Sequence, residues 1–192
     1  MSLDQETFQL LKDSVQRFVR ERLMPAEDHV EEHDEVPADI VSDMKELGLF
    51  GLSIPEEFGG IGLTLAQECE VAYELGHTAL AFRSVVGTNI GIGSQGILMD
   101  GTAEQKAEYL PRIASGDLIV SFALTEPDAG SDAASLKTKG VKDGNDYLLS
   151  GTKTCDVNLD SVRVPAANII GGEPGKGFKT AMKVLDRGRL HV

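Results

Sequence analysis

The chain has 192 residues and a formal net charge of −13 at pH 7, from 18 Lys and Arg against 31 Asp and Glu. This acidic balance argues against a nucleic-acid groove or an anionic membrane surface as a partner, because both would repel the protein as a whole. With 41% hydrophobic and 26% charged residues, the composition is that of a folded globular protein and excludes disorder as the main state.

The expected location follows from features that the sequence lacks. No apolar run approaches the roughly 18 residues that span a bilayer, which predicts no membrane insertion. Asp4 and Glu6 stand where a secretory signal would carry Lys or Arg, so we expect the protein not to be secreted. The two cysteines, Cys69 and Cys155, are too few for a disulfide framework. We therefore expect a cytoplasmic protein, or one of the mitochondrial matrix if the source is eukaryotic.

Residues 1–117 are predicted to form an all-α domain, beginning with an amphipathic helix. A capping box of Ser2 and Gln5 starts this helix, and Pro25 is expected to stop it. Its apolar residues recur at helical spacing, which predicts one buried face. They are Phe8, Leu11, Val15, Phe18 and Val19.

Further helices are expected in the same domain, five in all when one is counted within the small-residue stretch 81–99. Two of them span about 37–48 and 64–76, each ending at a glycine that suits a helix C-terminus. Another begins at a second capping box, formed by Thr102 and Gln105. The glycines and other small residues of 81–99 predict a buried stretch with close helix packing.

A domain boundary is expected near residue 117, and residues 118–170 are predicted to form a β-domain. The apolar, β-branched run at 118–124 indicates a buried strand that ends in a loop at 125–132. A hairpin follows at 136–152, with Asp143-Gly144 as its turn signal, and a further strand at 159–164. So few short strands cannot close a barrel and leave open edges, so this domain is expected to be incomplete.

Residues 171–192 are expected to begin a second helical domain, with a glycine-rich loop before a helix over 178–192. The fold class is therefore α+β. The loop does not match a phosphate-binding P-loop, because Ile170 stands where the first glycine is required. Gly177 also follows Lys176 where Ser or Thr would reach magnesium.

Residues 29–33 have two possible interpretations, a zinc site or a solvated connector. His29, Glu32 and His33 match H-x-x-E-H, in which two histidines bind zinc and the glutamate acts as a general base. A zinc hydrolase would need a third ligand such as Glu104 or Glu108. The segment lies between two prolines and is acidic throughout, so a solvated connector explains it with fewer assumptions.

The most informative segment is SFALTEPDAGSD at 121–132. A strand end that opens into a Pro/Gly loop presents backbone N–H groups and hydroxyls to an acceptor-rich ring or a pyrophosphate. The segment resembles the flavin-binding signature of the acyl-CoA dehydrogenase family. Five further segments resemble that family in the same order: PEEFGG at 55–60, LSGTKT at 149–154, VRVP at 162–165, GEPGKGF at 172–178 and LDRGRL at 185–190.

The resemblance implies an FAD enzyme with an N-terminal helical domain, a middle β-domain and a C-terminal helical bundle. The FAD-binding residues that it implies are Phe122, Leu124, Thr125, Gly130 and Ser131. The substrate-binding residues that it implies are Ser131, Asp186 and Arg189. Charged groups suited to the CoA phosphates are Arg187, Arg189, Lys137 and Lys139, for each of which a solvated role is an equal alternative.

The implied reaction is oxidation of an acyl-CoA thioester to the trans-2-enoyl-CoA in fatty-acid β-oxidation. A carboxylate takes the α-proton, the β-hydrogen leaves as hydride to FAD, and the electrons pass to an electron-transfer flavoprotein. Family members are homo-oligomers, usually homotetramers or dimers. Some carry the base at the position of Gly188, whereas others, including short-chain types, carry it later in the bundle. We therefore name no catalytic residue here and expect the base in sequence not shown.

The sequence differs from the family pattern in two places, and these differences suggest an alternative function. Thr154 is followed by Cys155, where the family continues into strands that cover the flavin, and the chain stops at the start of the bundle. The resemblance thus predicts a shortened or discontinuous chain that is inactive alone. The alternative is a non-catalytic remnant of the family that acts as a binding or assembly module.

Overall fold

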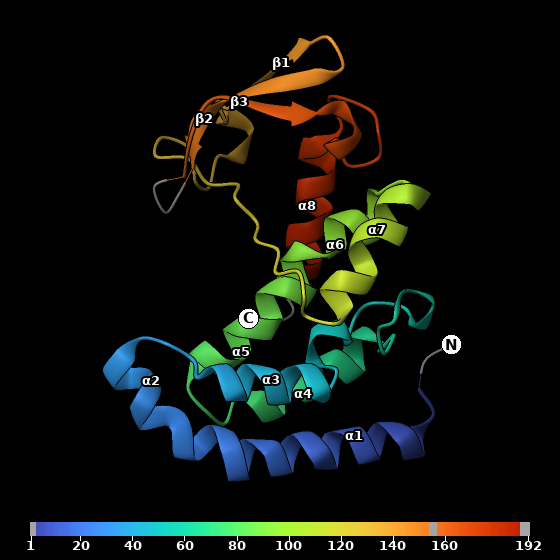
Figure 1. Ribbon diagram of the computed structural model, residues 1–192, viewed down its shortest axis with the longest axis vertical. Helices are drawn as coiled ribbons and strands as arrows, with labels where there is room; N and C mark the ends of the chain where they lie inside the picture. The colour runs from blue at the N-terminus through green and yellow to red at the C-terminus, as the bar shows by residue number, and fades with distance from the viewer. Residues whose placement is uncertain (1–2, 154–156, 189–192) are drawn as a thin grey trace.

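Helices gather at one end of the molecule and a small sheet lies at the other, with one long helix running between them (Figure 1). This computed structural model describes residues 3–153 and 157–188. The helices before residue 115 are α1 Gln5–Phe18, α2 Glu27–His33, α3 Ala38–Glu46, α4 Leu65–Leu75, α5 Leu80–Thr88, α6 Gln95–Asp100 and α7 Ala103–Ala114. None of the helices in the described ranges is long and apolar enough to cross a membrane.

Helix α1 confirms the amphipathic pattern but starts at a different cap. Phe8, Val15 and Phe18 are buried against the other helices. The side chain of Asp4 accepts a hydrogen bond from the Thr7 N–H and so caps the first turn. The predicted capping box was therefore wrong in assigning the cap two residues early, and Ser2 lies outside the described residues.

The chain does not leave its helical course at Pro25, contrary to the sequence prediction. A π-helical turn, Val19–Leu23, and a 3-10 turn, Met24–Ala26, lead from α1 into α2. In the π turn the N–H of Met24 bonds to the carbonyl of Val19, five residues back. Pro25 occupies the start of the 3-10 turn, where its missing N–H is not needed. The helix changes type around Pro25, and the chain continues into α2.

The helix-end signals at the other predicted sites are confirmed. Helix α3 ends before Gly48, which adopts a left-handed φ of +71°. Helix α7 begins with the predicted capping box, in which Thr102 and Gln105 bond each other's backbone N–H groups. Helix α4 has the same arrangement at Thr64 and Gln67.

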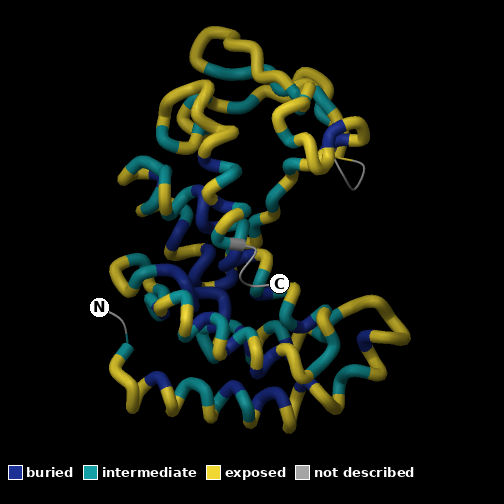
Figure 2. Tube along the Cα trace, turned by 180° about the vertical axis from the view of Figure 1, so that it is seen from behind, coloured by how far each residue is buried: buried dark blue, intermediate teal, exposed yellow. Residues whose placement is uncertain are grey.

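The hydrophobic core lies among the helices, and the sheet is mostly exposed (Figure 2). One cluster joins α1, α3, α4 and α5 around fully buried residues such as Phe50 and Phe82. A smaller cluster under α7 contains Leu110 and Ile113. All five residues of the first strand are exposed. The helical end therefore holds the packing that stabilises the chain.

The sheet has three antiparallel strands, β1 Lys139–Asp143, β2 Asp146–Lys153 and β3 Val157–Pro165, in the order β1-β2-β3. The predicted hairpin is confirmed, with Asp143 opposite Asp146 and Gly144 at φ +62° in the two-residue turn. The register shifts by one residue between Leu149 and Gly151, because β3 carries an extra residue between Val162 and Leu159 and bulges against β2.

The predicted buried strand at 118–124 was wrong. Within the described residues this segment pairs with no strand, and from 119 to 125 exposed and half-buried side chains alternate. The alternation is that of an extended chain with one covered face. A buried strand requires a hydrogen-bonded partner strand, and neither β1, β2 nor β3 pairs with this segment. Packing on one side therefore explains its apolar residues.

Helix α8, Gly177–Gly188, follows the glycine-rich loop as predicted. Gly171, Gly172 and Gly175 take left-handed φ values of +71° to +85°, which explains the glycines without a phosphate ligand. The rest of the predicted helix, 189–192, lies outside the described residues. Helix α8 runs beside α6, so it connects the sheet end with the helical end (Figure 1).

Candidate functional site

The structure brings the five predicted flavin-binding residues together around one cavity. Phe122, Leu124, Thr125, Gly130 and Ser131 line a space of about 560 Å³, together with residues of α8 and β3. The remaining lining residues are Ser121, Ala123, Ala133, Val157, Met182 and Leu185. Segments 121–125, 130–133 and α8 thus form three walls of the candidate site.

The first wall, segment 119–125, is fixed to the helical end by a buried asparagine. Asn89 is fully buried in the π-helical turn Asn89–Gly93. Its Nδ2 donates to the carbonyl of Ile113 at 3.3 Å, and its Oδ1 accepts the N–H of Val120 at 2.8 Å. A Cβ at Gly93 would lie 2.9 Å from Val120 Cγ2, so the close approach of the segment requires glycine there.

The second wall is the loop that carries Gly130 and Ser131. A Cβ at Gly130 would approach only Thr125 Cγ2, at 3.9 Å, so the backbone at this position is open to a ligand. Ser121, Thr125 and Ser131 are exposed and bring hydroxyl groups to a cavity that is otherwise mostly apolar. This combination suits a flat apolar ring with polar edges.

The third wall is α8, which contributes Met182 and Leu185. Two polar contacts from α6 hold this helix. Asp100 accepts a hydrogen bond of 2.6 Å from Thr180 Oγ1 and another of 2.6 Å from Lys183 Nζ. The Lys183 ammonium, with the Thr180 hydroxyl, lowers the pKa of the Asp100 carboxyl below its usual value. The carboxylate therefore stays ionised and keeps both contacts at neutral pH.

A buried ion pair holds the far end of α8. Arg187 Nη2 lies 2.6 Å from Glu68 Oε1 on α4, and the Glu68 side chain is completely buried. The sequence interpretation offered Arg187 to the CoA phosphates, but the structure assigns this guanidinium to a carboxylate. Desolvation makes Glu68 dependent on such a partner.

Of the other predicted phosphate ligands, Lys137 is also engaged, since its Nζ lies 2.9 Å from Asp128 Oδ2. Lys139 is exposed on β1, and Arg189 lies outside the described residues. Asp186, a predicted substrate ligand, is exposed on α8 and does not line the cavity. Two of the four cationic groups offered for CoA, Arg187 and Lys137, are thus paired with carboxylates of this chain.

The described residues that line the cavity include no carboxylate and no imidazole. Gly188 ends α8, one turn beyond Leu185. The expectation that the base lies outside the residues seen here therefore stays a prediction.

A second cavity of about 600 Å³ lies beside the first and shares Ser121 and Phe122 with it. Its walls are the inner side of the sheet, with Tyr147 and Leu149, and the helices α6 and α8. This space is mostly apolar and lies beneath strands that are exposed elsewhere.

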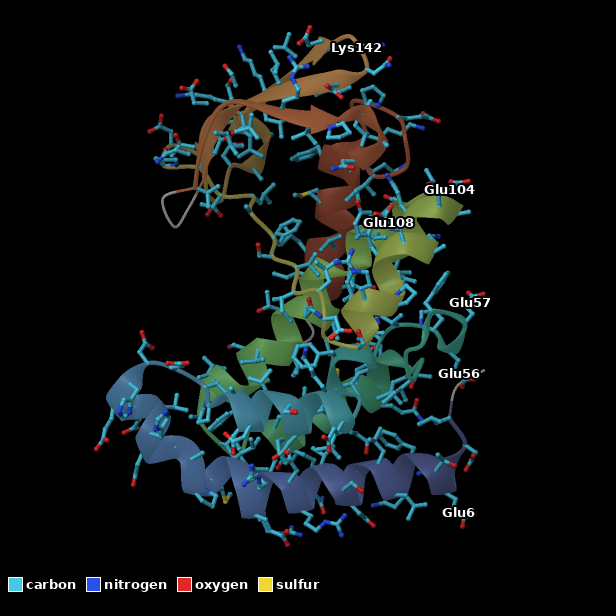
Figure 3. All side chains as sticks on the ribbon, in the orientation of Figure 1. Glu6, Glu56, Glu57, Glu104, Glu108 and Lys142 are labelled. Atoms are coloured by element: carbon cyan, nitrogen blue, oxygen red, sulfur yellow. The ribbon has the colours of Figure 1, made fainter. Side chains whose placement is uncertain are left out.

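The zinc motif does not form a site in the described ranges. His29 and His33 stack with ring centroids 4.3 Å apart on α2, and His33 Nδ1 lies 3.0 Å from the His29 carbonyl oxygen. Glu104 and Glu108 lie on α7, at the opposite side of the molecule from α2 (Figures 1 and 3). Nowhere in residues 3–153 and 157–188 do three His, Cys, Asp or Glu residues gather as a metal requires.

Sequence reasoning missed the residues that hold the walls in place. Asn89 is a fully buried polar residue inside an apolar stretch, which was the signal that could have identified it. Glu68 on α4 gave no such signal, because its partner lies 119 residues away in the sequence. Met182 and Leu185 followed the apolar face of α8 but could not be assigned to a cavity from periodicity alone.

Comparisons with known proteins identify the class. Residues 5–117 match the family described as the acyl-CoA dehydrogenase N-terminal domain. The chain is 42% identical to the (2S)-methylsuccinyl-CoA dehydrogenase of Cereibacter sphaeroides over 99% of its length. It superposes on a glutaryl-CoA dehydrogenase in complex with glutaryl-CoA with a TM-score of 0.88 and 26% identity, covering the whole chain.

The protein therefore belongs to the acyl-CoA dehydrogenase family, as the sequence resemblance indicated. An acyl-CoA dehydrogenase from Bacillus anthracis, solved in complex with FAD, shares its fold with a TM-score of 0.84 and 26% identity over 97% of this chain. The helical domain followed by a small antiparallel sheet is thus the fold of these relatives.

The chain spans 46% of the length of the Cereibacter relative, 62% of the glutaryl-CoA dehydrogenase chain and 40% of the Bacillus chain. The alignment with the Cereibacter relative extends over 254 positions, although this chain has 192 residues. A sizeable part of the relative therefore has no counterpart inside the aligned region of this chain.

Proposed function

We propose that this chain forms the flavin-binding part of an FAD-dependent acyl-CoA dehydrogenase. The observation that carries the proposal is the single cavity at which Phe122, Leu124, Thr125, Gly130 and Ser131 meet α8. These residues come from the segment that resembles the family's flavin signature. Family membership and the FAD complex of the Bacillus relative support the same assignment.

The residues present fit the isoalloxazine ring and the adjoining polar groups of FAD. A volume of about 560 Å³ lies within the usual range of cofactor pockets. Phe122, Leu124, Met182 and Leu185 would cover an apolar ring. The hydroxyls of Thr125 and Ser131, with the open backbone at Gly130, would hold its polar atoms.

FAD, when bound, supplies the acceptor for the hydride that leaves the β-carbon of an acyl-CoA thioester, giving the trans-2-enoyl-CoA. The residues of this chain bind and orient the ring and exclude water from its apolar side. Ser131 would lie at the junction of the cofactor and the CoA ester. Asp186 and Arg189 would border the substrate channel, although Asp186 lies on the exposed side of α8.

The α-proton requires a carboxylate base, which we place outside the described residues and not at Gly188. An electron-transfer flavoprotein is the proposed electron acceptor, and a dimer or tetramer is the proposed assembly. Acyl-chain length is left open, because none of the described residues is assigned to an acyl pocket.

A second candidate function has its own support. The alignment positions without a counterpart here, and a three-stranded sheet whose outer strands β1 and β3 are mostly exposed, are what a non-catalytic binding or assembly module of the family would show. Such a module would bind FAD weakly or not at all and would reduce no dye.

The test is equilibrium dialysis of the purified chain against FAD, followed by addition of butyryl-CoA or palmitoyl-CoA. We expect about one FAD per chain and a flavin spectrum shifted from that of free FAD. Bleaching of the bound flavin by either thioester would support dehydrogenation by the chain itself. FAD binding without bleaching would support the expected absence of the base, and no FAD binding would contradict the proposal.

A further inference from the structure

A buried carboxylate lies at the base of the loop that carries Gly130 and Ser131. Glu126 is only 7% exposed, although it belongs to a loop and not to a helix or strand. Its Oε2 accepts the N–H of Lys137 at 2.7 Å, and its Oε1 accepts the N–H of Thr138 at 2.9 Å. Both oxygens of one carboxylate are therefore used by two consecutive backbone amides, 11 and 12 residues further along the chain.

The same residue closes the near end of the loop through its backbone. The N–H of Glu126 donates to the carbonyl of Ala129 at 3.0 Å, and the N–H of Ala129 donates back at 3.1 Å. Ala129 is 3% exposed, so this turn is packed as well as hydrogen-bonded. One residue thus fixes both the first turn and the last residues of segment 126–138.

The far end of the loop is also packed against the sheet. A Cβ at Gly151 in β2 would clash with the Oγ1 of Thr138, so the loop and this strand lie in direct contact. Movement of Thr138 would therefore disturb both its amide contact to Glu126 and its packing on β2. The loop is held between the carboxylate and the strand.

We propose that Glu126 is a positioning residue for the cavity. Thr125 precedes it directly, and Gly130, Ser131 and Ala133 lie inside the loop that its carboxylate closes; all four line the cavity. Charge-assisted hydrogen bonds to backbone N–H groups are shorter and stronger than neutral ones. The carboxylate thereby keeps the second wall of the site in shape before any ligand binds. The identity of that ligand as FAD rests on the proposed function, whereas the shape of the loop does not.

The geometry requires a glutamate and not merely a polar residue. Two N–H donors need two acceptor oxygens, so a glutamine would turn its NH₂ group toward one of the amides of Lys137 and Thr138. An aspartate keeps both oxygens but is one methylene shorter. We therefore expect E126Q to lose most of the hold on the Lys137 and Thr138 amides, and E126D to retain part of it.

The experiment compares the full chain with E126Q, E126D and the control D128N. Asp128 lies in the same loop and pairs with Lys137 Nζ, but it is exposed. Hydrogen exchange at the amides of Lys137 and Thr138, without ligand, is expected to be about tenfold faster in E126Q, less so in E126D, and unchanged in D128N. The dissociation constant for FAD is expected to rise by about the same factor in the same order.

Each outcome separates positioning from general stability. Amides in the helical core serve as the internal reference, so faster exchange everywhere in E126Q would overturn the proposal. Unchanged exchange at Lys137 and Thr138 would overturn it too. If E126Q does not fold, E126D decides by the same two amides. Faster exchange at these amides in a chain that binds no FAD would support the role of Glu126 and contradict the proposed function instead.

Discussion

The helical end and the sheet end of this chain are stabilised in different ways. The helices hold two hydrophobic clusters, the larger with Phe50 and Phe82 and the smaller with Leu110, and all three side chains are completely buried. The strands bury much less: β1 is exposed throughout, Val141 in its centre is 61% exposed, and β2 is only half-buried over 146–149. A sheet of this kind holds its shape by backbone pairing and by its attachments to the helices. The cavity lies between the two ends, so its shape depends on those attachments.

Among the described residues, three sets of polar contacts connect the two ends, besides the apolar packing of α8 on α6. Asn89 holds segment 119–125, Glu68 and Asp100 hold α8, and Gln105 holds the chain between β3 and α8. Gln105 Nε2 donates to the carbonyls of Ala167 and Ile169, and its Oε1 accepts the N–H of Gly171. Each of these attachments consists of a few polar contacts, whereas the core of the helical end is apolar.

The largest expected effect is in the helical core. Phe82→Ala should lower the free energy of unfolding by about 3–5 kcal/mol, because it leaves a cavity at a fully buried site. The matched change at the sheet end, Val141→Ala, should lower it by less than about 0.5 kcal/mol. Urea unfolding followed by circular dichroism measures both. Equal losses in the two variants would show that the sheet shares the core after all.

Breaking the buried ion pair should have the next largest effect. Arg187→Met removes the guanidinium from a carboxylate that is completely buried, and should cost about 2–3 kcal/mol, toward the low end for such pairs because Arg187 keeps 27% exposure.

The control for that variant is Arg163→Met, which removes an exposed pair with Asp143 and Asp146 on the sheet. Its cost should be less than about 1 kcal/mol. Thermal unfolding of both variants tests the difference. A control that loses as much stability as Arg187→Met would contradict the account of Glu68.

The Gln105 attachment can be isolated because the chain has two similar capping boxes. Gln105→Ala and Gln67→Ala each remove the glutamine at the N3 position of a capping box, which costs about 1 kcal/mol. Only Gln105→Ala also leaves the backbone groups at Ala167, Ile169 and Gly171 without this partner, which should add about 1–2 kcal/mol. Denaturant midpoints of the two variants give the difference directly, and equal midpoints would refute the attachment.

The smallest effect is the pH dependence of the Asp100 contact. The folded-state pKa of Asp100 is lowered, so its contribution to stability is present above the unfolded value of about 3.9 and is lost as pH falls through the folded pKa. Asp100→Asn should therefore be less stable than the wild type at pH 7 by less than about 1 kcal/mol. The gap should close as the pH falls below about 4 and Asp100 becomes protonated in the folded state. If the stability difference between Asp100→Asn and the wild type is the same at pH 7 and at low pH, the contacts to Lys183 and Thr180 are excluded as its cause.

The sequence predicted the helices better than the sheet, for physical reasons. Helix ends depend on local signals, and the capping box at Thr102 and the C-terminal Gly48 were read correctly because cap and helix lie within a few residues. The strand prediction at 118–124 failed because a strand requires a partner, and alternation with a single covered face cannot reveal whether one exists. Pro25 was misread since the π-helical turn before it has no sequence signal of its own.

The residues of the candidate site also fall into two groups, those that local sequence predicted and those that it could not. Its lining residues from 122 to 131 were identified by resemblance, because the signature is continuous in sequence. The residues that hold the walls come from distant positions and were missed, since the partners of Asn89 and Glu68 are known only once the chain is folded. Arg187 was assigned to phosphate for the same reason: a cation near a proposed channel says nothing of a buried carboxylate on another helix.

The measurement that tests the central claim most directly is hydrogen exchange across the whole chain with and without saturating FAD. We predict slower exchange in two places, segment 121–131 and helix α8, with the outer strand β1 and helices α1 to α3 unchanged. Protection confined to other elements, or no change at an FAD concentration that saturates related enzymes, would contradict the assignment of this cavity to the flavin.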